Sequence, residues 1–162
     1  MTLGFTLDVG CGIGRNLGHL DGNGVGVDHN PDCVSTCRHN GLVAYSPDAF
    51  NSSGFAVDDR FDSLLMSHVI EHMTTEEAAA LVAKYLRFVK PSGRVILITP
   101  QERGQKSDAS HVTFVDEALV LEIAAHTGLR LASVRSFPFP RAAGRIFTYN
   151  ETVCTLARTE RP

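Results

Sequence analysis

The segment LDVGCGIG, residues 7–14, constrains the fold of this chain more than any other part of the sequence. An apolar run from Phe5 to Val9 leads into three glycines at alternate positions, and a helical pattern follows. Glycines in this arrangement allow a tight turn and let a ligand approach the backbone closely. The segment therefore predicts a strand, a tight turn and the start of a helix, with a ligand site at the turn.

The spacing of these glycines bears on the kind of ligand. A dinucleotide-binding turn reads G-x-G-x-x-G, but its third glycine would fall on Arg15 if counted from Gly10 and on Leu17 if counted from Gly12. The chain instead has D-x-G-x-G-x-G, with Asp8 ahead of the glycines. A pyrophosphate prefers exposed helix N–H groups, whereas an amino-acid zwitterion also needs a carboxylate near its ammonium group. The pattern favours the second kind of ligand.

A second acidic residue follows the next apolar run, residues 24–27, and this residue is Asp28. In a parallel sheet the two strand ends lie side by side, so Asp28 is expected beside the glycine turn. A carboxylate at this position can accept hydrogen bonds from two vicinal ribose hydroxyls. The alternative is a generic α/β turn in which both acids cap helices. The order and separation of the two features favour a ribose-containing ligand.

Alternating strand and helix patterns predict a doubly wound, Rossmann-like α/β fold. Asn30-Pro31 and Thr74-Thr75-Glu76-Glu77 are helix-start signals, and Pro91-Ser92-Gly93 is a stop signal. The expected sheet is seven-stranded and mostly parallel, with an antiparallel last strand at or near its edge. Strands are expected at 5–9, 24–28, 42–46, 61–66, 94–99, 129–136 and 146–157, helices at 14–20, 31–40, 74–90 and 116–126, and a loop at 47–60.

The segments that carry these signals resemble the motifs of the class I S-adenosylmethionine-dependent methyltransferases, the small methyltransferase-domain type in particular. The resemblance covers nearly the whole chain and implies one domain over residues 1–162. Many relatives have one or two helices before the first strand, and this sequence shows no such helices. The loop over 101–115 or a neighbouring subunit is expected to close the site in their place. The segments are LDVGCGIGRN, VGVDHN, SPDAF, RFDSLLMSHVIEHM and VKPSGRVILITP.

The resemblance implies S-adenosylmethionine as cofactor and S-adenosylhomocysteine as product. It places one group of residues along the methionine portion, Asp28 at the ribose with His29 against the adenine, and a third group at the sulfonium side. Asp48 would accept the adenine amino group with Ala49 adjoining, although a simple loop acid after Pro47 is the alternative. The first group is Asp8, Gly10, Cys11, Gly12 and Gly14, and the third is Ser67, His68 and Val69.

His111 is the expected general base, because a histidine in the loop after the fifth strand could remove a proton from an acceptor hydroxyl. Anchoring of the loop by His111 is the alternative. The run His68-Val69-Ile70-Glu71-His72 also matches the inverted zinc-peptidase signature H-x-x-E-H. It follows an apolar strand and precedes a helix start, and no third ligand is evident, so no metal is expected. His72 is expected to pack at the turn over the cofactor.

The composition supports this reading of function. A net charge of −3 over 162 residues gives no field for holding nucleic acid, and no apolar run reaches the length of a membrane span. The four cysteines form no disulfide or zinc pattern, which favours a cytoplasmic protein. We expect a methyltransferase acting on a small molecule, as a monomer or weak homodimer. A non-catalytic relative and a dinucleotide-binding oxidoreductase are the alternatives.

Overall fold

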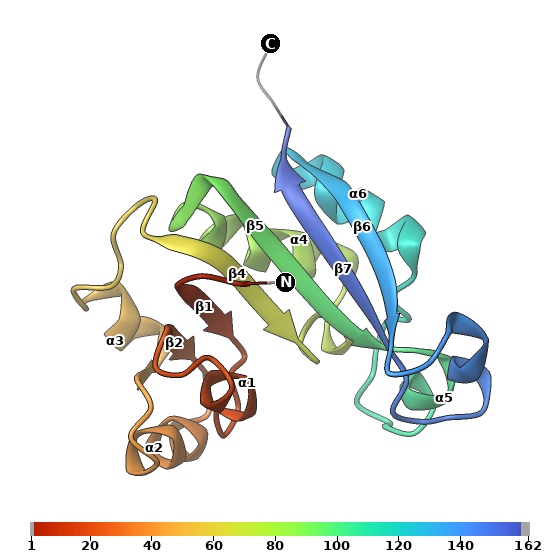
Figure 1. Ribbon diagram of the computed structural model, residues 1–162, viewed down its shortest axis with the longest axis horizontal. Coiled ribbons are helices and arrows are strands. Elements are labelled where there is room, and N and C mark those ends of the chain that lie inside the picture. The colour runs from red at the N-terminus through yellow and green to blue at the C-terminus, as the bar shows by residue number, and fades with distance from the viewer. Residues whose placement is uncertain (1, 160–162) are drawn as a thin grey trace.

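The computed structural model describes residues 2–159, and these residues form an α/β fold around one seven-stranded sheet (Figure 1). The strand order is β3-β2-β1-β4-β5-β7-β6. The first five strands are parallel, whereas β7 is antiparallel to both of its neighbours, β5 and β6. The predicted sheet type is thus confirmed. The strands are β1 (Thr6–Val9), β2 (Gly24–Val27), β3 (Ala44–Tyr45), β4 (Phe61–Ser67), β5 (Val89–Pro100), β6 (Leu129–Phe137) and β7 (Glu151–Arg158).

The helices begin where the sequence signals them. Asn30 caps α2, since its side chain accepts from the N–H of Asp32, and Pro31 takes the first helical position. Thr74 and Glu77 form a capping box at the start of α4. The helices are α1 (Arg15–Gly18), α2 (Pro31–His39), α3 (Pro47–Asn51), α4 (Thr75–Leu86), α5 (Glu102–Gln105), α6 (Glu117–Thr127) and the 3₁₀ turns η1 (Ile70–His72) and η2 (Arg141–Arg145).

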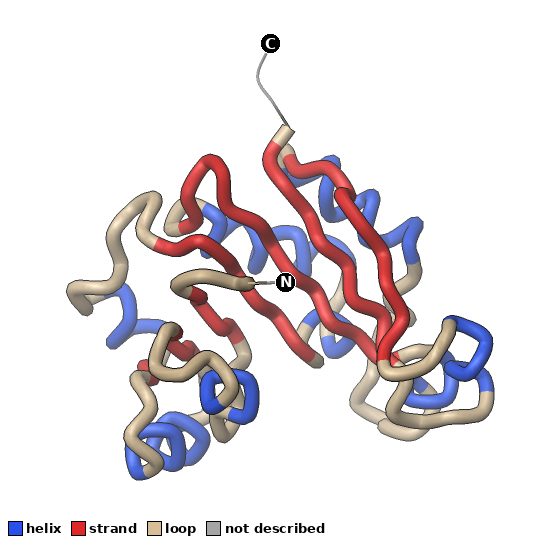
Figure 2. Tube along the Cα trace, in the orientation of Figure 1, coloured by secondary structure: helices blue, strands red, loops and turns tan. Residues whose placement is uncertain are grey.

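The main core lies between the sheet and the helices α4 and α6, which cover the same face of it (Figure 1). Leu64 and Met66 of β4 and Val95 and Leu97 of β5 are fully buried there, on alternate positions of their strands. Figure 2 shows the strands of the sheet side by side, with the irregular segments gathered at their ends. The core therefore fixes the strand ends that carry the candidate site residues.

Several predicted elements differ from the structure. The segment 47–60, predicted as a loop, contains α3, which Ser46 caps and whose Phe50 is fully buried. The helix before β5 ends at Leu86 and not near residue 90, and β5 begins at Val89 and not at residue 94. Val89 pairs with Phe61 and is buried in the core, and this tertiary burial overrides the local stop signal.

The last strand also begins later than predicted, although it is antiparallel and lies near the edge of the sheet as predicted. β7 starts at Glu151 and not at residue 146, because η2 and the turn after it occupy the preceding residues. It is inserted between β5 and β6, so β6 forms the edge of the sheet. Among residues 2–159, no helix is long and apolar enough to cross a membrane.

The described chain before β1 runs across the face of the sheet opposite α4 and α6 (Figure 1). Its backbone is held there by β4, because the Leu3 carbonyl accepts from the Ser63 hydroxyl at 2.6 Å. The Phe5 N–H donates to the Asp62 carboxylate at 2.8 Å. These contacts fix the start of β1 and hence the position of the glycine turn at its end.

Candidate functional site

A cavity of about 610 Å³ opens at the carboxyl ends of β1, β2 and β4, where open α/β sheets bind ligands. Its wall includes the glycine turn, the end of β2 and the turn after β4. One side of α4 completes the cavity wall. The sequence did not indicate this part of the site, because the α4 residues form an ordinary amphipathic pattern. The wall residues used below are Gly10, Gly12, Asp28, His29, His68, Val69 and His72.

The three glycines of the turn all have positive φ, but their surroundings differ. A Cβ atom on Gly10 would overlap the Val69 side chain, and one on Gly14 would come within 2.5 Å of Leu42. A Cβ on Gly12 would meet no protein atom within 4 Å. Gly10 and Gly14 are therefore required for packing, whereas Gly12 belongs to the cavity wall and has open space beside it.

Asp28 stabilises the glycine turn through hydrogen bonds to backbone N–H groups. One carboxylate oxygen accepts from the Gly12 N–H and the other accepts from the Asn30 N–H, both at 2.8 Å. The residue is 7% exposed at the cavity wall. Asp28 thus lies beside the glycine turn, as predicted. Its carboxylate also holds the backbone of the turn through hydrogen bonds, which the sequence did not indicate.

Asp8 has an unusual environment. The residue is fully buried in β1, and neither of its carboxylate oxygens has a hydrogen-bond partner among the described residues. Burial, together with the nearby charge of Asp28, raises the pKa of Asp8 from 3.8 to about 7. A buried carboxylate without a partner is costly for a folded protein unless a ligand or water completes it.

Apart from His68, two of the remaining predicted cofactor residues belong to the cavity wall and four do not. His29 and Val69 belong to the cavity wall, and His29 is largely exposed there. Asp48 and Ala49 lie on the exposed side of α3 and are not part of the wall. Cys11 is buried, and burial strongly raises the pKa of its thiol. Ser67 is the last residue of β4 and lies next to the wall residue His68.

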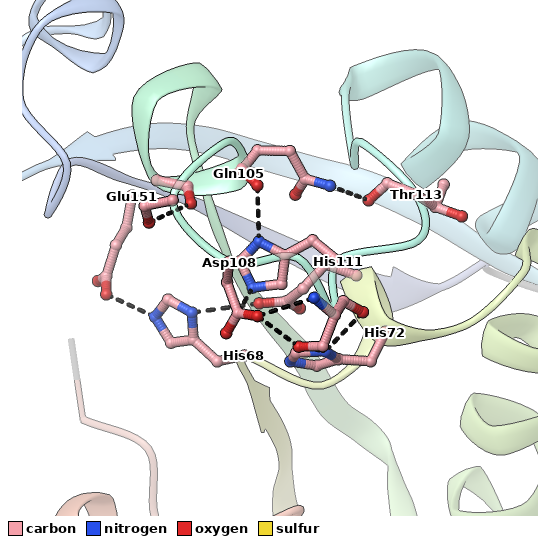
Figure 3. A network of polar contacts seen from close by, with 11 residues as sticks. His68, His72, Gln105, Asp108, His111, Thr113 and Glu151 are labelled. Carbon is pink, nitrogen blue, oxygen red and sulfur yellow. Dashed lines mark hydrogen bonds and ion pairs between the residues drawn. The ribbon is translucent and has the colours of Figure 1, made fainter.

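His68 lies between two carboxylates (Figure 3). Its Nδ1 is 3.2 Å from Glu71 Oε1, and its Nε2 is 2.7 Å from Glu151 Oε1 on β7. These two contacts raise the pKa of His68 to about 9, so the imidazole is a cation at neutral pH. Both ring nitrogens are occupied, so the H-x-x-E-H run lacks the free first histidine that a zinc peptidase needs.

His111, the expected general base, does not belong to the cavity wall. Its side chain is 8% exposed, and its ring packs against that of His72 with 4.9 Å between the centroids (Figure 3). The following residues join this loop to η1, since the N–H groups of Val112 and Thr113 both donate to the Glu71 carbonyl. The loop over 101–115, expected to cover the site, is therefore already anchored to η1 near the cavity.

Comparisons with known proteins agree with this geometry. A family model described as a methyltransferase domain matches residues 7–97. A methyltransferase from Archaeoglobus fulgidus has a TM-score of 0.73 at 18% identity over 93% of this chain and 84% of its own. A putative methyltransferase from Haloferax volcanii, solved with the Trm112 activator, has a TM-score of 0.73 at 19% identity over 97% and 82%. Magnesium protoporphyrin IX methyltransferase from Synechocystis, solved with bound S-adenosylmethionine, has a TM-score of 0.64 at 17% identity over 96% and 70%. No curated protein matches the sequence.

Proposed function

The chain belongs to the class I S-adenosylmethionine-dependent methyltransferases, and on this premise we propose that its cavity binds S-adenosylmethionine for methyl transfer to a small molecule. The observation that carries the proposal is the buried, unpartnered carboxylate of Asp8 beside the glycine turn, which has no hydrogen-bond partner among residues 2–159. The amino-acid end of the cofactor has an ammonium group that would satisfy this carboxylate, and a dinucleotide has no such group. The residues present therefore fit this cofactor.

Residues of the cavity wall and residues beside it would hold the rest of the cofactor. Asp28 retains lone pairs beyond those used by Gly12 and Asn30, so it can also accept from ribose hydroxyls. His29 would lie against the adenine, and Asp48 and Ala49 would approach it from α3. Ser67, His68 and Val69 would lie at the sulfonium side. When bound, the cofactor supplies a methyl group on a cationic sulfur, and the protein has to position the acceptor and exclude water.

Direct titration separates this function from the two alternatives. Calorimetry should show binding of S-adenosylmethionine and S-adenosylhomocysteine and no binding of NAD. A cell extract with labelled methyl donor should then yield a labelled small molecule. Binding of NAD alone would favour an oxidoreductase, and cofactor binding without any labelled product would favour a non-catalytic module. A labelled macromolecule would contradict the proposed acceptor class.

Gly12→Ala should weaken cofactor binding with little loss of folding stability beyond backbone strain. The added methyl group meets no protein atom within 4 Å and stands on a residue of the cavity wall. Gly41→Ala is a matched control, since Gly41 also has positive φ, +75°, and open surroundings but is not part of the cavity wall. Both variants should lose about 1–2 kcal/mol of stability from the strained backbone. Equal cofactor affinities of the two variants would contradict the site.

Asp28→Ala should cost about 1.5–3 kcal/mol of cofactor binding, the value of a lost charge-assisted contact. Part of this loss comes from the glycine turn, because Asp28 also accepts from the Gly12 N–H. Calorimetry with S-adenosylhomocysteine and with adenosine alone measures the effect, and thermal melting confirms that the variant is folded. Unchanged affinity for both ligands would exclude Asp28 from the ribose site.

A further inference from the structure

The structure brings His111 to the adjacent residues Glu71 and His72, and these are three potential metal ligands. One ligand atom from each lies within 4.8 Å of the other two. Figure 3 shows His72 and His111 side by side. We propose that these three residues bind a divalent first-row transition metal ion, with Zn²⁺ as the test ion. This departs from the expectation from sequence that no metal is bound, because that expectation considered His68 with His72 and found no third ligand.

The hydrogen bonds of His72 and His111 use only one nitrogen of each ring, so the other nitrogen of each ring can bind a metal. Nδ1 of His111 lies 3.0 Å from the Gln105 carbonyl oxygen, and Nδ1 of His72 lies 3.2 Å from the Ser110 carbonyl oxygen. A carbonyl oxygen only accepts, and the Ser110 hydroxyl, which also lies 3.2 Å from His72 Nδ1, donates its proton to Asp108. Each Nδ1 therefore carries the proton, and each Nε2 keeps a lone pair. Metal-bound histidines commonly donate their other N–H to a carbonyl in this way.

Glu71 supplies the independent observation that a ligand is missing. Its side chain is fully buried, and Oε1 contacts His68, but Oε2 has no hydrogen-bond partner among the described residues. An acceptor in this position is normally satisfied by a donor or a cation. A metal ion held by Oε2 and the two imidazoles would remove this deficit.

The loop that carries His111 is held firmly against η1, so little rearrangement is needed. The Thr113 hydroxyl donates to the Met73 carbonyl at 2.9 Å, in addition to the two N–H bonds to the Glu71 carbonyl. Asp108 adds a carboxylate 4.0 Å from His111 Nε2. Ligand atoms around a zinc ion lie about 3–3.5 Å apart, so the group would contract by about an ångström on binding.

The ligand set indicates which ions would bind. Two imidazoles and one carboxylate form the set of many catalytic zinc sites, in which a further position stays open for water or substrate. Mg²⁺ and Ca²⁺ prefer sets made only of oxygen atoms. His72 is exposed and also belongs to the cavity wall, so the ion has an entry path and would border the cavity. A bound metal lowers the pKa of a hydroxyl or water that it contacts. If the proposed function holds, the position of the ion beside the cavity therefore favours a hydroxyl group as the methyl acceptor.

Metal binding can be tested without any methylation assay. Chain freed of metal with a chelator is titrated with Co²⁺, followed by its visible absorption, and with Zn²⁺ by calorimetry. One ion per chain is expected, and excess Mg²⁺ should not displace it. Glu71→Gln, His72→Asn and His111→Asn should each weaken binding by at least the ~10–100-fold that is typical when even an outer-sphere partner of a metal is lost.

His126→Asn is the matched control, since His126 has the same Nδ1 contact with a backbone carbonyl, that of Glu122, on the surface of α6. This variant should bind the metal as the unmodified chain does. If Glu71→Gln does not fold, the exposed His72 still tests the site. Absence of saturable binding, or affinities that the three substitutions leave unchanged, would overturn the proposal. Because the titrations contain no cofactor, their failure is distinguishable from failure of cofactor binding.

Discussion

Asp8→Asn should weaken cofactor binding and at the same time stabilise the free protein. The carboxylate is the proposed partner of the cofactor ammonium, and loss of such a charge-assisted contact costs about 10- to 100-fold in affinity. In the free protein the same carboxylate is buried without a partner among residues 2–159, so its ionised form is unfavourable. The neutral amide removes the cost of burying the charge, which is the larger part of that penalty. Calorimetry and thermal melting of one preparation measure both effects.

Folding stability and cofactor affinity should depend on pH in opposite directions, because both depend on the ionisation of Asp8. The pKa of Asp8 is about 7 in the folded chain, against 3.8 for an unperturbed aspartate, so the folded state loses stability as pH rises from about 4 to about 7. This difference corresponds to at most about 4 kcal/mol, which Asp8→Asn would recover at pH 8. Cofactor binding changes in the opposite direction, since only the carboxylate form binds the ammonium.

Affinity of the unmodified chain should therefore fall about tenfold between pH 8 and pH 6, and affinity of Asp8→Asn should not change over this range. Asp28→Ala weakens cofactor binding at another position and should retain a pH dependence, displaced to lower pH because the Asp28 charge contributes to the raised pKa of Asp8. A destabilised Asp8→Asn variant, or one that binds the cofactor normally, would show that Asp8 is not the ammonium partner.

His111→Asn should lower turnover with the identified acceptor by about 10²-fold or more, the usual effect of losing a group that assists proton removal. S-adenosylhomocysteine affinity should stay nearly unchanged, since His111 is not part of the cavity wall. The asparagine amide can still donate to the Gln105 carbonyl, so the loop keeps this anchor. Initial rates and calorimetry on the same variant separate the two quantities.

The cause of the loss can also be separated. If His111 acts as a metal ligand, a chelator should lower the turnover of the unmodified chain and added Zn²⁺ should restore it. If turnover falls in His111→Asn while the unmodified chain binds no metal, His111 removes the proton by itself. Normal turnover of His111→Asn would mean that the histidine only anchors its loop. His126→Asn should retain full turnover in every case.

The sequence was sufficient for those parts of the fold that depend on local signals. The glycine turn after β1, the cap at Asn30 and the capping box at Thr74 all depend on residues within a few positions of one another. It was insufficient where distant burial decides, as for α3 and the early start of β5. The insertion of β7 between β5 and β6 likewise depends on pairing between distant strands.

The candidate site divides in the same way. Sequence alone located Asp8, Asp28 and the glycines, because parallel strand ends must meet at one edge of a sheet. Only the tertiary structure showed that Asp8 lacks a partner among the described residues, since that depends on every group packed around it. Only the tertiary structure showed that His111 lies close to Glu71 and His72. Hydrogen bonds between two segments far apart in the sequence set this distance, and no spacing in the sequence encodes it.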